Sequence, residues 1–287
     1  MKILNCGLTI AVAAALSANT SLASTANDIT LISADQILGS ELKTTDGKEV
    51  GELEYIVIET TSGNLLFALI EEDDDLKLED DNLVVLPFEK LDVTSIDDEV
   101  NVSLSLKELS SAMTIHEDDV ATLSSPVVQT QVYQHLESVS DPIAEPVAYA
   151  KATSHYLIID DDDIETITPE RNILDSKVVN HSNQDFGEIE TIVLNLSDDK
   201  VAYTIVETDG FLGLGENKYP VPMQGLVWDK DRSAYVSTIV ETDLSGRFSN
   251  IPKSKLPTNI NKIELDNFYR AHGISSDEQV LDNDKSS

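Results

Sequence analysis

The chain has 287 residues, 41% of them hydrophobic, and its 53 acidic against 19 basic side chains give a formal charge of −34 at pH 7. This hydrophobic content is enough to build buried cores, and the length favours two domains of ordinary size. So negative a charge, without clusters of Lys or Arg, excludes nucleic acid and anionic membrane surfaces as expected partners.

Residues 1–23 have the pattern of a cleaved export signal. Lys2 supplies a positive charge, residues 8–18 are uncharged and rich in alanine, and small residues precede the expected cleavage after Ala23. Cleavage after Ala26 is the alternative. The apolar stretch is shorter than the roughly 20 residues that a membrane-spanning helix needs. We therefore expect the mature protein in the periplasm of a Gram-negative bacterium, or secreted.

Cys6 is the only cysteine and lies within the predicted signal. The mature chain is then expected to contain neither a disulfide nor a thiol nucleophile. Its stability must come from the burial of apolar side chains, since disulfides are the usual supplement in exported proteins with small cores.

The sequence contains an internal repeat. Residues 37–91 align with residues 173–226 at a nearly constant offset of 136. The most specific matches are Ile37-Leu38 with Ile173-Leu174, Val50-Gly51-Glu52 with Phe186-Gly187-Glu188, and residues 65–71 with residues 201–207. We expect two copies of one domain, the first at residues 29–110 and the second at residues 169–273.

Each copy is predicted to consist of short strands. In the first copy, residues 53–58 and 65–71 are rich in Ile, Leu and aromatic residues and flank a turn-forming segment, which predicts a β-hairpin. Apolar residues alternate with polar ones at 100–106, which predicts another strand. Matching strands are expected in the second copy at residues 188–194, 201–207 and 234–240. Short strands without long helices between them predict a mainly β fold with two small β-barrels.

The segment between the copies has a different pattern. Residues 111–168 contain three prolines and predict an irregular linker with one short helix at residues 128–139, capped by Ser125. At the other end of the second copy, residues 260–272 predict an amphipathic helix that Gly273 ends. Residues 274–287 predict a polar tail.

Several motifs resemble the PRC-barrel family. The second copy carries the loop Gly210-Phe211-Leu212-Gly213-Leu214-Gly215, followed by Val221-Pro222. The first copy carries the opening Ile37-Leu38-Gly39 and the turn Asp46-Gly47-Lys48-Glu49-Val50-Gly51. The second copy departs from the family pattern at Asp175, which replaces the opening glycine, and the first departs at the loop, where acidic residues replace the glycine motif.

The resemblance implies a six-stranded small β-barrel in each copy and no shared catalytic site. Such barrels occur in the cytoplasmic part of the photosynthetic reaction-centre H subunit and in a ribosome maturation factor, and both of these proteins dock on larger assemblies. The predicted export and the acidic charge argue against transferring either role to this chain. The resemblance therefore implies a protein partner whose identity stays open.

The loop at residues 210–215 is the predicted docking feature. Its glycines suggest a phosphate cradle, but no Lys-Ser/Thr pair follows, the next segment is a strand, and Asp209 and Glu216 flank it with negative charge. A structural hairpin loop is therefore expected. Its apolar residues Phe211, Leu212 and Leu214 would form an exposed docking tip or pack on the end of the barrel.

Acidic runs at residues 71–75, 79–81 and 160–163 suggest calcium. None of them contains the glycine that an EF-hand loop needs, and consecutive Asp residues in an extended chain point to opposite faces. Divalent cations have weak candidate ligands in Asp73, Asp75, Asp160 and Asp162. A solvated, mutually repelling surface is the main expectation, and no metal site or cofactor is predicted.

Catalytic motifs are absent from the sequence. It has neither a Gly-x-Ser-x-Gly elbow nor a His-Glu-x-x-His pair, and its five histidines are scattered. We expect an exported, non-enzymatic interaction or scaffold module. The alternatives are an acidic Ca²⁺-binding protein of the envelope and an uncharacterised hydrolase. The charge also predicts that stability rises with salt, because salt screens the repulsion between acidic groups.

Overall fold

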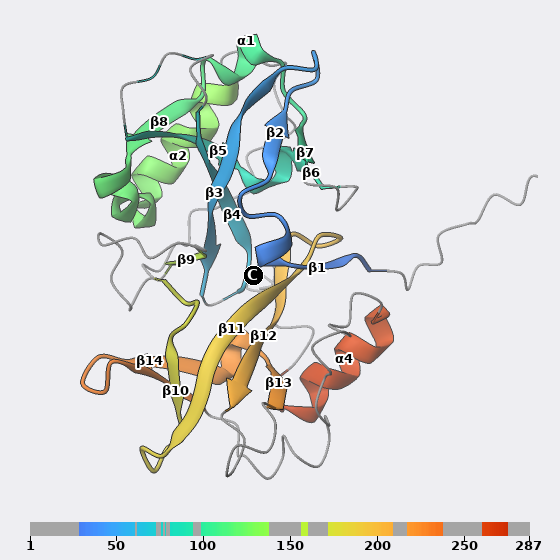
Figure 1. Cartoon of the computed structure of the whole chain (residues 1–287), viewed down its shortest axis with the longest axis vertical. Helices are drawn as coiled ribbons and strands as arrows, with labels where there is room; N and C mark the ends of the chain where they lie inside the picture. Colours follow the sequence, from blue (N-terminus) through green and yellow to red (C-terminus); the bar gives the residue numbers. More distant parts are fainter. Residues whose placement is uncertain are drawn as a thin grey trace, which may run out of the picture.

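The computed structural model describes residues 29–60, 62–72, 76, 78, 81–93, 99–137, 156–159, 172–208, 217–237 and 260–274. These residues form two β-sheets in two lobes, with short helices around them (Figure 1). The predicted mainly β fold with two related units is confirmed. The predicted signal and most of the polar tail lie outside the described residues. Within the described ranges, no helix combines the length and apolar character needed to cross a bilayer.

The first sheet has the strand order β6-β7-β2-β3-β4-β5-β8. Its strands are β2 (Glu41–Lys43), β3 (Glu49–Glu59), β4 (Leu65–Glu71), β5 (Asn82–Pro87), β6 (Leu91–Asp92), β7 (Glu99–Val102) and β8 (Met113–His116). The pair β2–β7 is parallel and the other pairs are antiparallel. The predicted hairpin is β3–β4, and the predicted strand at 100–106 is β7, which ends at Val102.

The second sheet repeats this plan with the order β13-β12-β11-β10-β15-β14. Its strands are β10 (Lys177–Val179), β11 (Asp185–Asn195), β12 (Lys200–Thr208), β13 (Asn217–Val221), β14 (Leu226–Asp229) and β15 (Ala234–Ser237). The pair β10–β15 is parallel, as its counterpart β2–β7 is in the first sheet. Among the described strands, the pairing in each sheet follows an open path.

A helix covers the outer face of each sheet. In the first copy α2 (Pro126–Glu137) packs on β3, β4 and β5, and in the second α4 (Lys262–Ala271) packs on β11 and β12. Both helices begin with a backbone hydrogen bond at equivalent positions. Gln129 N–H donates to Ser125 O in α2, and 136 residues later Leu265 N–H donates to Asn261 O in α4. The repeat therefore extends to these helices. Shorter helical turns are α1 (Leu106–Leu109), η1 (Ala34–Gln36), η2 (Phe88–Lys90), η3 (Glu117–Ser124) and η5 (Met223–Gly225).

Two short strands cross from one copy to the other. β1 (Leu31–Ser33) lies at the start of the first copy but pairs antiparallel with β11 of the second. β9 (Tyr156–Ile159) precedes the second copy but pairs antiparallel with β3 of the first. Leu31, the first residue of β1, lies opposite Asn195, and Tyr156, the first residue of β9, lies opposite Glu59. Glu59 and Asn195 are counterparts at an offset of 136, so the two strands have the same register. Each copy therefore completes the sheet of the other.

The turns of the two equivalent hairpins also meet. Asn64 and Lys200, which are 136 residues apart, form a single antiparallel bridge. On either side of it, Leu65 N–H donates to Asp199 O at 2.9 Å, and Val201 N–H donates to Gly63 O at 2.7 Å. This reciprocal pattern places a pseudo-twofold axis at the bridge.

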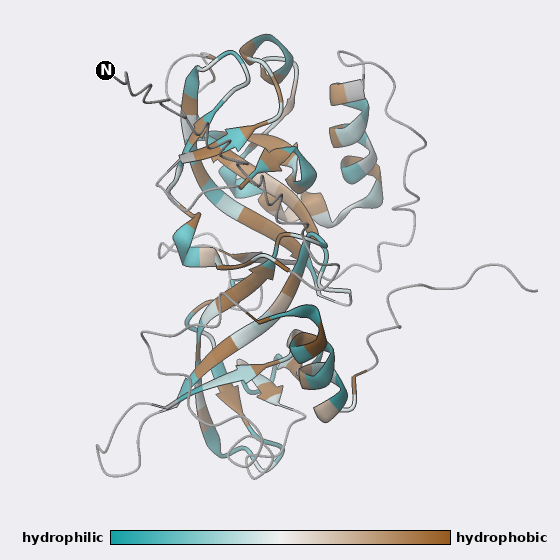
Figure 2. Ribbon diagram, turned by 90° about the vertical axis from the view of Figure 1, so that its right-hand side faces the viewer, coloured by the Kyte–Doolittle hydropathy of each residue, from teal (hydrophilic) through white to brown (hydrophobic). Residues whose placement is uncertain are grey.

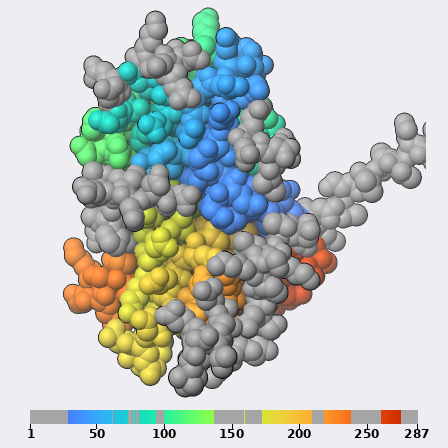
Figure 3. Space-filling model, in the orientation of Figure 1, coloured from blue at the N-terminus to red at the C-terminus, as the bar shows by residue number. Residues whose placement is uncertain are grey.

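One hydrophobic core joins the two lobes. Its buried residues come from both copies and include Ile32, Ile58, Leu65, Leu194 and Val201, which lie at or beside the exchanged strands and the bridge. Figure 2 shows hydrophobic residues along the long strands, and Figure 3 shows the first copy, in blue and green, in direct contact with the second, in yellow and orange. The two lobes are therefore packed as one unit.

The structure adds strands that the sequence did not predict. β8 and β9 both fall in the segment expected to be a mainly irregular linker, and β1 was not predicted either. The linker helix is present but begins two residues earlier than expected, at Pro126, and the C-terminal helix is shorter than expected, with Gly273 at a φ of 73° just beyond its end.

Candidate functional site

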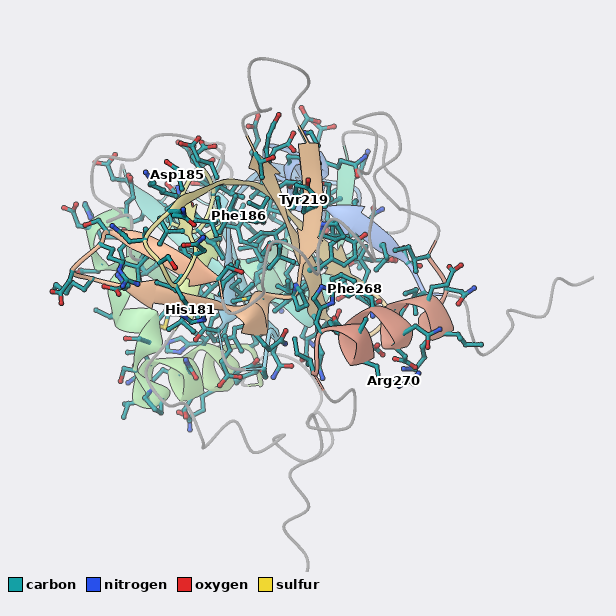
Figure 4. The ribbon with its side chains drawn as sticks, turned by 90° about the horizontal axis from the view of Figure 1, so that it is seen from below. His181, Asp185, Phe186, Tyr219, Phe268 and Arg270 are labelled. Carbon is teal, nitrogen blue, oxygen red and sulfur yellow. The ribbon has the colours of Figure 1, made fainter. Side chains whose placement is uncertain are left out.

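The loop end of the second sheet is the candidate site. β12 and β13 stay paired up to Thr208 and Asn217, the two residues between which the predicted docking loop runs. The loop itself, from Gly210 to Gly215, lies outside the described residues, so its docking role stays a prediction. Figure 4 shows Asp185, Phe186 and Tyr219 in the second copy, with Phe268 of α4 turned to the body of the protein and Arg270 turned away.

Four aromatic residues distinguish the second copy from the first. They are Phe186, Tyr219, Trp228 and Tyr235, and their counterparts at offsets of 135 or 136 are Val50, Val84, Val93 and Val100. All eight side chains belong to the central core or pack against it. The aromatic residues contact one another in pairs, with ring centroids 6.1 Å apart for Phe186 and Tyr219 and 5.1 Å apart for Trp228 and Tyr235.

A buried lysine lies at the base of the predicted docking loop. Lys218, only 5% exposed, forms ion pairs with Glu190 and, at 3.5 Å, with Glu207. Glu190 is the extra residue of a bulge in β11, and such a bulge re-aims a side chain. The counterpart of Lys218 in the first copy is Leu83, so this charged cluster belongs to the second copy alone. Because a buried ammonium is costly without partners, these pairs fix the strands that carry the loop.

The first copy has a row of four glutamates, whereas the row in the second copy has a lysine at each end. Glu99, Glu41, Glu52 and Glu71 are direct register partners across β7, β2, β3 and β4. Glu41, Glu52 and Glu71 are exposed. In the second copy the row across β10, β11, β12 and β13 reads Lys177, Glu188, Glu207 and Lys218. Like charges directly opposite one another destabilise a sheet. Both copies have one such pair between their two long strands, but the pair of Glu41 with Glu52 in the first copy is replaced by the attractive pair of Lys177 with Glu188 in the second.

Replacing Glu41 by lysine, the residue found in the second copy, is therefore expected to stabilise the protein. Two repulsive cross-strand pairs become attractive, which is worth about 0.5–1 kcal/mol at low salt. Thermal unfolding at low and high NaCl measures the effect, and the gain in Tm should shrink with salt. The matched control is Lys177→Glu, which also removes the 2.6 Å ion pair with Asp185 and should lower Tm. A fall in Tm for Glu41→Lys would contradict the repulsion.

The cation candidates receive no support from the described part of the chain. Asp73, Asp75, Asp160 and Asp162 lie outside it, and within it no group of three or more His, Cys, Asp or Glu side chains is arranged to hold a metal ion. Within the first acidic run, the Glu72 carboxylate accepts hydrogen bonds from the backbone N–H groups of Leu76 and Leu78, whose side chains pack on the core. The flanks of this loop are thus anchored to the protein.

Charges also meet where the two copies join. Burial raises the pKa of Asp199, and the nearby carboxylates of Glu89 and Asp198 add to the rise. Burial lowers the pKa of Lys200 in the same turn, although Asp198 opposes the change. The bridge between the copies is therefore held by its backbone hydrogen bonds and the surrounding core, while its carboxylates are mutually unfavourable.

Sequence reasoning overlooked the aromatic residues and Lys218. The repeat alignment contained the signal, because all five positions change character between otherwise matching strands. Reading the alignment for differences as well as matches would have found them.

Comparison with known families agrees with the division of the chain into two copies. The model of a family described as the PRC-barrel domain matches residues 29–107 and 170–242, which together make up more than half of the chain. The first matched segment contains β1 to β7 and the second contains β10 to β15, while β8 and β9 lie between them. The resemblance expected from the motifs of both copies is confirmed. No curated protein matches the chain.

Proposed function

Because this chain belongs to the PRC-barrel family, whose domains are generally non-catalytic, we propose that it is a non-enzymatic interaction module of the cell envelope. In this role the two fused barrels form a rigid unit that presents one loop end to a protein partner.

One observation carries the proposal: the two copies share a fold but differ at the loop end. In the second copy this end has the partly exposed Tyr219 packed on the buried Phe186, together with a buried lysine, and the apolar sequence of residues 211–214 joins its strands. In the first copy the same end has buried valines and the exposed Glu52 and Glu71. Aromatic and apolar residues are typical of interface centres, whereas exposed carboxylates are depleted there. The second copy is therefore the proposed docking end.

Replacing Leu212 and Leu214 by aspartate is expected to abolish partner capture. Two charges in an apolar contact cost several kcal/mol, which reduces affinity by a factor of 100 or more. The measurement is affinity capture from envelope extracts with the mature protein as bait, followed by quantitative mass spectrometry of proteins that depend on the loop.

The matched control carries two neutral changes in the acidic loop of the first copy, Asp74→Asn and Asp75→Asn. These changes should leave the captured set intact. An identical captured set for the wild type and the Leu212/Leu214 variant would overturn docking through this loop, and turnover of any substrate by the purified protein would overturn the non-enzymatic role.

We also propose export to the periplasm or beyond the cell, on the strength of the signal pattern in residues 1–23. The protein recovered from a Gram-negative host should then lack this segment and begin at Ser24, or at Asn27 if cleavage follows Ala26. Cell fractionation with N-terminal sequencing measures this. Full-length protein confined to the cytoplasm would refute it.

A further inference from the structure

Two buried polar groups at the edge of the second sheet have no hydrogen-bond partner in the described part of the chain. They are the indole Nε1 of Trp228 and the hydroxyl of Tyr235. The two residues lie directly opposite one another on β14 and β15, so their side chains share one face of the sheet, and their rings meet edge to face at 5.1 Å. Tyr235 is 3% exposed.

These polar groups are not needed to build the barrel. The first copy forms the matching strands β6 and β7 with Val93, directly after β6, and Val100 at the two positions, and neither valine has a polar atom in its side chain. A buried donor without an acceptor is unfavourable, so a native protein that keeps two of them side by side needs an explanation. A group that accepts hydrogen bonds from both donors supplies one.

We propose that the second barrel binds a small, largely apolar molecule through a neutral hydrogen-bond acceptor, such as a carbonyl oxygen, held by Trp228 Nε1 and the Tyr235 hydroxyl. The acceptor role follows from chemistry, because an indole N–H only donates. The apolar body follows from the surroundings, since Tyr235 and its register neighbour Val178 are buried members of the hydrophobic core and Trp228 packs against it.

The acceptor must be neutral. No cation lies opposite the two donors in the cross-strand register, where the neighbours on this face are Val178 and Gly187. Burial alone raises the pKa of Tyr235, which reflects the cost of placing a negative charge there. A carboxylate ligand would meet the same cost. Trp228 is only partly buried, so the site borders the surface.

Trp228 is the only tryptophan of the chain, so its fluorescence reports on this site alone. The experiment titrates the mature protein with 2-heptanone as the neutral probe and with heptanoate as its anionic counterpart. We expect a saturable change in indole emission with the ketone and none with the carboxylate. Tyr235→Phe, which removes one donor, should raise the Kd for the ketone about fivefold to tenfold.

Tyr203→Phe is the matched control. It removes another buried hydroxyl that has no partner among the described residues, but from the separate cluster beneath α4. This variant should bind the ketone as the wild type does, and circular dichroism checks that both variants fold. The proposal is overturned if the ketone gives no saturable change, which would favour an ordered water as the acceptor. It is also overturned if Tyr235→Phe binds the ketone as tightly as the wild type, or if heptanoate binds as well as the ketone.

Discussion

Replacing Gly187 by alanine is expected to lower the free energy of unfolding by about 3–5 kcal/mol. Gly187 has a φ of 148°, and a Cβ atom added there would lie 2.0 Å from the backbone oxygen of Glu207 on the adjacent strand. The added methyl group therefore meets rigid backbone, and the only relief is to separate β11 from β12. Those two strands are the longest of the second sheet.

The first copy has the same constraint. Gly51 has a φ of 128°, and its added Cβ would lie 1.8 Å from the backbone oxygen of Glu71. Both glycines stand near the start of a long strand, where the chain must pass close to its neighbour for the sheet to curl. Gly51→Ala is therefore expected to be as damaging as Gly187→Ala. Because the lobes share one core, either change should lower the single unfolding transition of the whole protein.

Gly39→Ala isolates the steric contribution. Gly39 has a φ of 70°, but nothing lies within 4 Å of the position that its Cβ would occupy. This control carries only the conformational cost of a left-handed residue, about 1 kcal/mol. Chemical denaturation of the three variants gives the comparison. Equal losses for Gly39→Ala and Gly187→Ala would show that the close approach to Glu207 contributes nothing.

The repeat was the part of the fold that the sequence could predict. Strands β3, β4, β11 and β12 carry long apolar runs around polar turns, so both central hairpins were recognisable from local pattern alone. The helix α4 was likewise predicted from its apolar spacing and from Gly273. These features depend on residues close together in the chain, which is where pattern is informative.

The strand exchange could not be predicted in this way. β1 has three residues and β9 has four, and each pairs with a strand of the other copy that is far away in sequence. Such short segments have too few positions to show a period, and their apolar residues fit a loop equally well. Each short strand is held by the part of β11 or β3 with which it pairs, and this part is formed only after the other copy has folded.

The candidate site was likewise only partly predictable from the sequence. The apolar character of residues 211–214 was visible in the sequence, whereas the ion pairs of Lys218 depend on a bulge at Glu190 that local pattern does not reveal. The unsatisfied donors of Trp228 and Tyr235 depend on what surrounds them in three dimensions. Sequence alone showed only that the second copy has aromatic residues where the first has valines.

The exchange makes the two copies mutually dependent, and this leads to the second large effect. Separating the chain between Ser140 and Asp141 yields one fragment that carries β1 and α2 and another that carries β9 and α4. Alone, the first fragment leaves half of β3 without β9, and the second leaves half of β11 without β1. Each also exposes its share of the common core, which costs on the order of 5 kcal/mol or more, comparable to the whole stability of a small domain.

Neither fragment is therefore expected to unfold cooperatively by itself, whereas an equimolar mixture should regain the circular dichroism and the thermal transition of the intact protein. Ile32→Asp in the first fragment should abolish this recovery, because Ile32 is 1% exposed and pairs with Leu194 of the second copy. Val127→Asp, at a position 67% exposed on α2, is the matched control and should leave the recovery unchanged.

Since β1 and β9 are equivalent, the first fragment at high concentration should form a dimer in which β1 of one molecule pairs with β3 of the other. A fragment that folds as a stable monomer with the Tm of the intact chain would show that the exchanged strands are not required.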